Sequence, residues 1–326
     1  MQKAESNKEV TIMKLIDTHC DTAIEILRRG ESIVENSRHI SLNKAKIYDN
    51  YAQFFACWAC EDRTDEEGYQ EFLAMTDNMA KEIEMNSDKL VRVDTFTEMK
   101  KAWDEGKTAA FFAVEDARLL CGDINRLYEL KRRGVKYLTI MWGGHTHIGA
   151  SHDVLGGLTD FGKEVVQKCF ELGICPDVSH SNEQVTSEII EMAYKAGKPV
   201  IASHSNSYSV WGHTRNLRDE HFKAIKELGG IVGISLCCAH LRDGSTGIPC
   251  TVDHIVQHID RYVELGGEDI IGLGCDLDGT RLPVGITGLQ DLPVIADALK
   301  AKGYSDEFVD KLFYKNYYNF IERNFK

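Results

Sequence analysis

The sequence predicts an α/β fold in which eight parallel strands and their helices close into a (β/α)8 barrel, the TIM-barrel architecture. Three observations support this prediction. The chain carries eight short apolar runs, most of them separated by an amphipathic helical pattern. The runs are continuously apolar, which is typical of strands buried on both faces of a parallel sheet. Eight such strands are the number that a (β/α)8 barrel requires.

The predicted strands begin with "KLIDTHCD" and end with "DIIGLGCDLDG". They cover residues 14–21, 52–58, 108–116, 135–142, 174–180, 199–205, 230–236 and 269–279. An open, doubly wound sheet is the competing architecture. The "GLG" at 272–274 resembles part of a dinucleotide-binding loop, but it lacks the full G-x-G-x-x-G pattern and an acid at the expected distance. The barrel is therefore the favoured prediction.

Helical patterns fill most of the connections. Residues 160–173 carry one apolar face and stop at Gly173. Residues 181–199 begin at Ser181, a residue type typical of helix caps, and end in Gly followed by Pro. Similar patterns predict helices over 65–86, 218–230, 251–267 and 313–325. The aromatic residues of the last segment are expected in the core.

The chain is expected to form one domain. It has 326 residues, only five prolines and no low-complexity stretch that would mark a linker. Residues 1–13 are polar and mixed in charge, so they are predicted to form a frayed tail. Residues 14–326 are predicted to form a single barrel domain with helices at its C-terminal end.

Composition argues against several classes of protein. The formal net charge is -13 and no basic stripe is present, so nucleic acid and anionic membranes are not expected as partners. No apolar run approaches the roughly 18 residues of a membrane span. The N-terminus lacks the apolar core of a signal peptide, which predicts a cytoplasmic location.

The ten cysteines are expected to be reduced thiols in such a compartment. "CWAC" at Cys57–Cys60 has the C-x-x-C spacing of redox and zinc sites. It ends an apolar run, and no second C-x-x-C exists to complete a four-thiolate site. Buried core thiols are the favoured interpretation.

Metal-competent side chains gather at the carboxyl ends of five predicted strands, where barrel enzymes carry their chemistry. These residues are His19, Asp21, Glu115, His180, His204, Asp276 and Asp278. His19 and Asp21 are two apart, so an extended strand would present both at the barrel mouth while Cys20 between them faces the helices. An imidazole nitrogen beside a carboxylate suits zinc. Each motif alone is also compatible with a structural role, but their coincidence favours a metal centre.

Glu115 adds a second feature to this candidate centre. A carboxylate has two oxygens and can bridge two ions, and His180 with His204 would complete the second ion's ligands. Two ions about 3.5–4 Å apart can hold a shared hydroxide and polarise a carbonyl.

Five motifs together resemble a known family. "DTHCD", "AVED", "DVSH", "ASHSNSYSVWGHTRN" and "GLGCDLDG" are similar, in order, to the motifs of the membrane (renal-type) dipeptidase family, zinc metallopeptidases of the amidohydrolase superfamily. The resemblance runs from about Leu15 to Asn319 and is most specific in "SHSNSYSVWGHTRNLRD". It is nearest to the soluble bacterial branch, because neither an export signal nor a hydrophobic tail is evident.

The resemblance implies a metal-dependent hydrolase barrel with two Zn²⁺ per chain. His19, Asp21 and Glu115 would hold one ion, and Glu115, His180 and His204 the other. The implied reaction is hydrolysis of a dipeptide by a metal-bridging hydroxide. Asp276 would handle the proton, and Arg215, in "HTRN", would bind the free carboxylate of the substrate. The resemblance is also compatible with a homodimer.

The chain departs from the family's best-known members after the fourth barrel strand. Those members have a histidine there that contacts the substrate carbonyl, whereas this chain has Trp142. His145 and His147 follow closely, and either would serve if it reached the site, although an exposed loop position is the favoured expectation for both. Tyr208 lies between His204 and Arg215, where it either lines the substrate pocket or packs the loop.

Two alternatives to a dipeptidase remain open from the sequence. A binuclear metallohydrolase acting on another amide or a lactam would use the same ligands. A catalytically silent, ligand-binding barrel would be consistent with the missing fourth-strand histidine, but the retention of all five ligand positions and Asp276 disfavours it.

Overall fold

The computed structural model describes residues 13–58 and 62–326. The predicted tail therefore lies outside the described residues except for Met13, whose backbone N–H donates to Asp49 at 2.9 Å. Cys60 of the predicted C-x-x-C motif also lies outside them.

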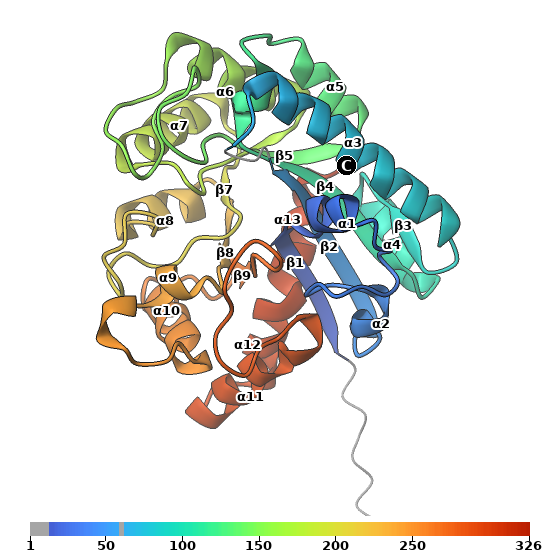
Figure 1. Ribbon diagram of the computed structural model, residues 1–326. Coiled ribbons are helices and arrows are strands. Elements are labelled where there is room, and N and C mark those ends of the chain that lie inside the picture. Colours follow the sequence, from blue (N-terminus) through green and yellow to red (C-terminus); the bar gives the residue numbers. More distant parts are fainter. Residues whose placement is uncertain (1–12, 59–61) are drawn as a thin grey trace, which may run out of the picture.

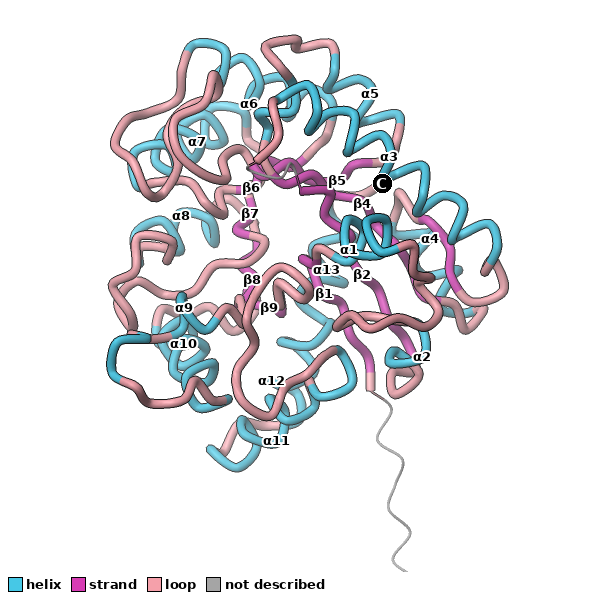
Figure 2. The backbone as a smooth tube through the Cα atoms, viewed as in Figure 1, coloured by secondary structure: helices cyan, strands magenta, loops and turns pink. Residues whose placement is uncertain are grey.

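The described strands form one parallel sheet that closes into a barrel, as predicted. The strands are β1 (Lys14–Cys20), β2 (Asn50–Trp58), β3 (Leu90–Arg92), β4 (Thr108–Glu115), β5 (Val135–Thr139), β6 (Cys175–Asp177), β7 (Ile201–Ala202), β8 (Ile231–Ile234) and β9 (Ile271–Leu273). Their order is β2-β1-β9-β8-β7-β6-β5-β4-β3, and an added β2–β4 pairing closes the ring. Figure 2 shows the strands at the centre of the molecule with helices around them.

Eight of the strands match the eight predicted ones, and β3 was not predicted. It pairs with Thr108–Ala110 of β4, whereas β5 pairs with Phe112–Glu115. Since β2 occupies the other edge of β4, β3 and β5 share one edge in succession. β3 is thus an addition to the barrel wall, too short at three residues for a periodic signal.

The helices lie mainly outside the strands (Figure 1). They are α1 (Thr22–Arg29), α2 (Leu42–Ala45), α3 (Asp65–Met85), α4 (Phe96–Asp104), α5 (Arg126–Arg132), α6 (Asp160–Leu172), α7 (Glu183–Ala196), α8 (Asp219–Glu227), α9 (Cys238–Leu241), α10 (Val252–Glu264), α11 (Pro293–Lys302), α12 (Asp306–Asp310) and α13 (Asn316–Asn324). Gly173 and Gly197 end α6 and α7 in the left-handed conformation, as their positions indicated. The cap of α7 is Asn182, not Ser181, because the Asn182 side chain accepts the Val185 N–H.

Two apolar layers hold the fold together. One lies between strands and helices and includes Leu15, Cys20 and Phe55. The other fills the barrel interior, where Phe54 and Phe111 stack with ring centroids 4.5 Å apart. The C-terminal helix belongs to this inner layer through Tyr317, Phe320, Ile321 and Phe325, so its aromatic residues are core residues, as expected. Cys20 is fully buried in the outer layer and faces away from the barrel mouth.

Several strands end earlier than predicted. Where the chain leaves the sheet, hydrogen bonds from side chains take the place of the backbone hydrogen bonds between strands. Asp177, at the end of β6, is the clearest case. Its carboxylate accepts the backbone N–H groups of Ser179 (3.0 Å) and Ser203 (2.8 Å) and the hydroxyl of Thr139 (2.6 Å). These bonds satisfy the backbone without further strand pairing. The segments after β5, β6 and β7 are therefore free to turn toward the barrel mouth.

Candidate active site

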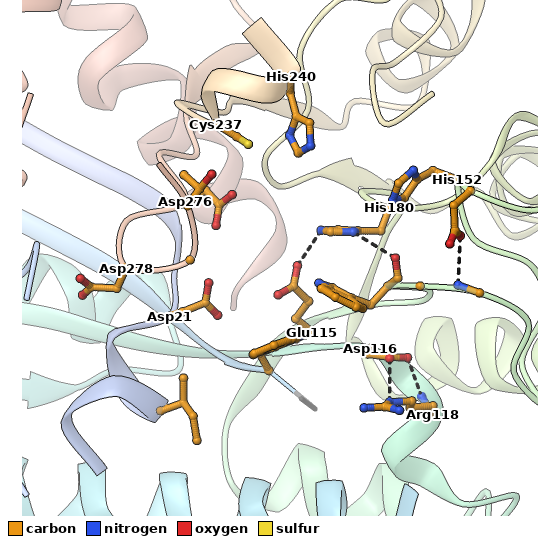
Figure 3. Close-up of a pocket in the computed structure, with 18 of the residues that line it drawn as sticks. Asp21, Glu115, Asp116, Arg118, His152, His180, Cys237, His240, Asp276 and Asp278 are labelled. Carbon is orange, nitrogen blue, oxygen red and sulfur yellow. Dashed lines mark hydrogen bonds and ion pairs between the residues drawn. The ribbon is translucent and has the colours of Figure 1, made fainter. Parts of the chain in front are cut away.

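A cavity of about 550 Å³ lies at the carboxyl ends of the strands. Its lining includes Asp21, Glu115, Trp142, His180 and Asp276, which the sequence singled out. Figure 3 shows Asp21, Asp276 and Asp278 on one side of Glu115 and His180 on the other. Residues from the segments after β1, β5, β6 and β9 thus meet Glu115 of β4 in one space.

Glu115 lies at the centre of the candidate ligands. Its Oε1 is 3.0 Å from His180 Nε2 and 3.3 Å from His204 Nε2. Its Oε2 is 3.6 Å from His19 Nε2, and Asp21 Oδ2 is 4.0 Å from the same nitrogen. Two sets of possible metal ligands, His19–Asp21–Glu115 and Glu115–His180–His204, therefore share this carboxylate. A third set of ligand atoms joins His19 and His204 to Asp276.

Hydrogen bonds fix where each of the three histidines carries its proton. His19 Nδ1 lies 2.9 Å from the Tyr137 hydroxyl, which donates its own proton to the Thr18 carbonyl at 2.7 Å. The hydroxyl must then accept from Nδ1–H, which leaves a lone pair on Nε2.

The same logic applies to the other two rings. His204 Nδ1 is 2.7 Å from Ser203 Oγ, which donates to Asp177 Oδ2 at 2.5 Å. His180 Nδ1 is 3.2 Å from the Trp142 carbonyl, which can only accept. All three imidazoles therefore direct an Nε2 lone pair toward Glu115, the arrangement found in metal-ligating histidines.

The nitrogen and oxygen atoms that converge here can bind cations but cannot form hydrogen bonds with one another. His180 Nε2 and His204 Nε2 are 3.1 Å apart, and neither carries a proton in these tautomers. His19 Nε2, Asp21 Oδ1 and Glu115 Oε1 are buried without any hydrogen-bond donor among the described residues. Buried, unpaired acceptors that converge are costly unless positive charge lies between them. The residues present thus suit metal ions.

Electrostatics at the centre point the same way. Burial opposes the charged form of His19, yet the Glu115 carboxylate raises the pKa of this imidazole to about 10. Burial and then the Glu115 charge raise the pKa of Asp21 well above its ordinary value. Burial also raises the pKa of Asp276 to about 7, against the opposing charge of His19. The centre therefore attracts positive charge and holds a carboxyl poised near neutral pH.

The backbone at the strand ends is not extended. His180, Asp276 and Asp278 have φ of 68°, 59° and 71°, in the left-handed region that is uncommon for side-chain-bearing residues. Asp21 lies beyond β1, as the N-cap of α1. The prediction that His19 and Asp21 share a face through strand alternation was thus wrong in its reason, because the turn into α1 brings Asp21 back toward His19.

Arg215 is buried close behind the candidate ligands. Its Nη1 donates to Ser205 Oγ at 3.1 Å, whereas Nε and Nη2 are buried without a partner. No described carboxylate forms an ion pair with this guanidinium. Its charge helps to keep the pKa of His180 low, at about 4, after the larger effect of burial. Arg215 is not among the residues that line the 550 Å³ cavity. A buried guanidinium without an ion-pair partner is nevertheless suited to bind an anion that reaches it.

Two predicted substrate residues lie elsewhere. His145 is exposed and its Nε2 is 2.8 Å from the Leu155 carbonyl, outside the cavity lining. The Tyr208 ring stacks under the Arg218 guanidinium, with Cζ 3.3 Å from the ring centroid, and it is also outside that lining. His147 accepts the Gly122 N–H at 3.2 Å. His145 bonds within the loop after β5, which corrects its assignment to the substrate site. Tyr208, in the segment after β7, packs against Arg218, which is the packing alternative that the sequence left open.

Trp142 and His152 come from the same loop and do line the cavity. The Trp142 ring stacks on His180 with centroids 5.8 Å apart. The His152 ring lies 5.9 Å from that of His180, and burial followed by the Arg215 charge lowers its pKa to about 3. His152 is therefore a neutral histidine in the position that the sequence left to His145 or His147.

Residues that orient the candidate ligands were not predicted from the sequence. Tyr137 lies inside β5 and Asp177 ends β6, each as a polar group within an apolar run. A polar residue isolated within an apolar strand could have indicated a buried hydrogen-bonding role for both. His152 lies in a loop and His240, a further histidine in the cavity lining, lies on the short helix α9, and no sequence pattern marks either segment. His258 is buried with both nitrogens paired.

Comparisons with known proteins agree with this geometry. Residues 4–323 match the family model of membrane dipeptidases, peptidase family M19. The chain is 26% identical to a solved family M19 metallopeptidase, the dipeptidase AC, with a TM-score of 0.89 over 96% of this chain and 99% of that one. It is 25% identical to a Rhodobacter sphaeroides metallopeptidase solved with a phosphinate mimic of the dipeptide L-Ala-D-Ala, with a TM-score of 0.86 over 96% and 99%.

A Klebsiella pneumoniae protein of uncharacterised function, from the region 5′ of pqqA, is 32% identical over 223 residues, which are 65% of this chain and 81% of that protein. Within the described part of this chain, no helix combines the length and apolarity needed to cross a bilayer. The family match extends over nearly the whole chain and includes every strand of the barrel. The chain therefore belongs to the membrane dipeptidase family, peptidase family M19, and is a metallo-dipeptidase, a hydrolase that acts on peptide bonds.

Proposed function

We propose that the protein is a zinc-dependent dipeptidase that hydrolyses dipeptides with a free C-terminal carboxylate. The observation that carries this proposal is the convergence of three Nε2 lone pairs on the two oxygens of Glu115. Imidazole nitrogen and carboxylate oxygen form the ligand set typical of catalytic zinc. The arrangement supports two ions that share one carboxylate.

Each ion would have its own set of ligands. His19, Asp21 and Glu115 would hold one Zn²⁺, and Glu115, His180 and His204 the other. When bound, such ions acidify a water molecule and polarise the carbonyl of the substrate. The chain's contribution is to hold three histidines in one tautomer through Tyr137, Ser203 and the Trp142 carbonyl.

Asp276 is the proposed general base and acid. A carboxyl oxygen of Asp276 lies within 4.8 Å of a ring nitrogen of His19 and of His204. Burial raises the pKa of this carboxyl to about 7. A group with this pKa can accept the proton of an attacking water and return it to the leaving amine. The Asp276 backbone N–H donates to the His19 carbonyl at 3.1 Å, which holds the acid beside the ligands.

Arg215 and His152 are the proposed substrate-binding residues. The unpaired Nε and Nη2 of Arg215 would receive the terminal carboxylate as a bidentate pair. A longer peptide has no carboxylate at this distance from its first peptide bond, so this contact selects dipeptides. His152 would donate a hydrogen bond to the scissile carbonyl, in place of the fourth-strand histidine that this chain lacks.

The test is to measure metal per chain by mass spectrometry and then assay a panel of L-X and X-D dipeptides, amides and lactams with and without chelator. We expect about two zinc ions per chain and chelator-sensitive turnover of dipeptides. Glu115→Gln should lose most metal and nearly all turnover. Turnover of lactams but not dipeptides, or near-zero metal in active enzyme, would contradict the proposal.

A further inference from the structure

His240 is a cavity residue whose imidazole forms no hydrogen bond within the part of the chain that the structure describes. It lies on the one-turn helix α9 and lines the cavity, and Figure 3 shows its ring directed toward the space between Asp276 and His180. Neither ring nitrogen makes a hydrogen bond to a described residue, and Nδ1 is buried. A neutral imidazole carries one donor and one acceptor. Since buried polar groups are almost always paired, a bound molecule is the natural partner.

Three side-chain hydrogen bonds hold the backbone that carries His240. Three successive carbonyls of this segment each accept a hydrogen bond from a distant side chain: Ala239 from Trp211 Nε1 (3.0 Å), His240 from Asn216 Nδ2 (2.8 Å) and Leu241 from His258 Nε2 (3.0 Å). His258 Nδ1 in turn accepts the Ser207 N–H at 3.0 Å. Helix α9 is therefore tied to the 206–217 segment, which carries Arg215, and the ring position is fixed relative to that guanidinium.

The surroundings indicate which end of a substrate His240 faces. Its ring lies 5.0 Å from that of His213, whose Nδ1 accepts the Arg215 backbone N–H at 3.1 Å. Burial and then the Arg215 charge lower the pKa of His240 well below its ordinary value, so the ring is neutral near pH 7. A neutral N–H donor on the Arg215 side of the cavity complements an anion without adding charge.

We propose that His240 binds the C-terminal carboxylate of the dipeptide together with Arg215, by donating a hydrogen bond from its imidazole. The inference rests on the proposed dipeptidase function and identifies a second determinant of carboxylate recognition. Trp211, Asn216 and His258 act as positioning residues for it, because they hold the α9 carbonyls and do not line the cavity.

Two substitutions separate the hydrogen bond from the shape of the side chain. His240→Leu removes both nitrogens and keeps similar bulk, whereas His240→Asn retains an N–H donor near the position of Nδ1. The matched control is His254→Leu, on the outer helix α10, where the imidazole bonds to Thr251 at 3.2 Å. Metal per chain is measured in each variant, and it should equal that of the wild type.

The readouts are steady-state kinetics on a dipeptide and on its C-terminal amide, and calorimetric binding of a phosphinate dipeptide mimic with a free carboxylate. His240→Leu should lower kcat/KM for the dipeptide about 10- to 100-fold, mainly through KM, which is the range of a hydrogen bond to a charged group. Binding of the mimic should weaken by a similar factor. The amide should change less than about threefold, His240→Asn should recover most of the loss, and His254→Leu should match the wild type.

Two results would overturn the inference while leaving the dipeptidase proposal intact. In the first, His240→Leu stays within twofold of an active wild type in both kinetics and binding. In the second, dipeptide and amide lose activity equally. A wild type that neither turned over a dipeptide nor bound the mimic would instead overturn the proposed function, and the role of His240 with it.

Discussion

At the scale of single residues, the candidate centre depends on groups that set proton positions as much as on the ligands themselves. The Tyr137 hydroxyl donates a hydrogen bond to the Thr18 carbonyl, and the Ser203 hydroxyl donates one to Asp177. Each hydroxyl is then left to accept from a histidine Nδ1–H. Each ring therefore presents Nε2 rather than Nδ1 to the centre before any metal binds.

Tyr137→Phe should weaken metal binding while preserving the fold. The substitution keeps the aromatic ring in the barrel interior but removes the acceptor for His19 Nδ1–H. Loss of such an outer partner costs about 10- to 100-fold in metal affinity. Competition with a chromophoric chelator measures the change. Tyr48→Phe is the matched control, because it removes a buried hydroxyl that bonds to the Leu289 carbonyl instead. Equal metal affinity in both variants would contradict the tautomer assignment.

Arg215→Ala should act through the substrate carboxylate. We expect KM for a free-carboxylate dipeptide to rise by about 100-fold or more, since a charge-assisted bidentate contact is lost. The C-terminal ester of the same dipeptide should be nearly unaffected. Kinetics on the two substrates measure the difference. An equal loss on both would show that Arg215 supports the fold or the metal ligands and not the carboxylate.

At the scale of helices and strands, the sequence predicted which strand ends carry the ligands but not how the ends are built. Continuous apolar runs located all eight barrel strands, and the residues at or just after their carboxyl ends include every candidate metal ligand. The left-handed turns at His180 and Asp276 and the three-residue β3 depend on contacts with segments distant in sequence. Local periodicity cannot encode such contacts. For the same reason neither His152 nor His240 was assigned to the site from the sequence.

The α9–α10 region offers a prediction on pH. Burial lowers the pKa of His258 to about 4, and both ring nitrogens are bonded in the neutral form. The unfolded chain binds a proton near pH 6.5 and the folded chain does not, so stability is retained above pH 6.5 and lost as pH falls toward 4. The linked loss is about 3 kcal/mol, from roughly 2.5 pKa units.

Urea unfolding of the metal-free protein between pH 7.5 and 4.5 tests this linkage. His258→Asn should be less stable at pH 7.5 but should show a shallower fall with acid than the wild type. His254→Asn, on the same helix but outside the buried bridge, should keep the wild-type slope. The assignment fails if His258→Asn and the wild type lose stability in parallel.

At the scale of the whole molecule, the candidate ligands join strands that are far apart in sequence. They lie on or just after β1, β4, β6 and β7, which are spread around the barrel ring. The ladders of β1–β9 and β6–β7 are short, with one paired position each, and further backbone bonds such as Asp21 N–H to the Leu277 carbonyl extend the first. Cations bound at the centre would add links between these strand ends.

Metal removal should therefore lower thermal stability as well as abolish turnover. An ion present at about 1,000 times its dissociation constant stabilises the folded state by about 4 kcal/mol. For a chain of this length, that shift corresponds to about 5–6 °C in Tm, because the unfolding entropy scales with residue number. Scanning calorimetry of zinc-loaded and chelator-treated protein measures it. In Glu115→Gln, which lacks the shared carboxylate, chelator should change Tm by less than about 2 °C. A fully loaded wild type that melts at the same temperature with and without chelator would show that the centre does not tie the barrel together.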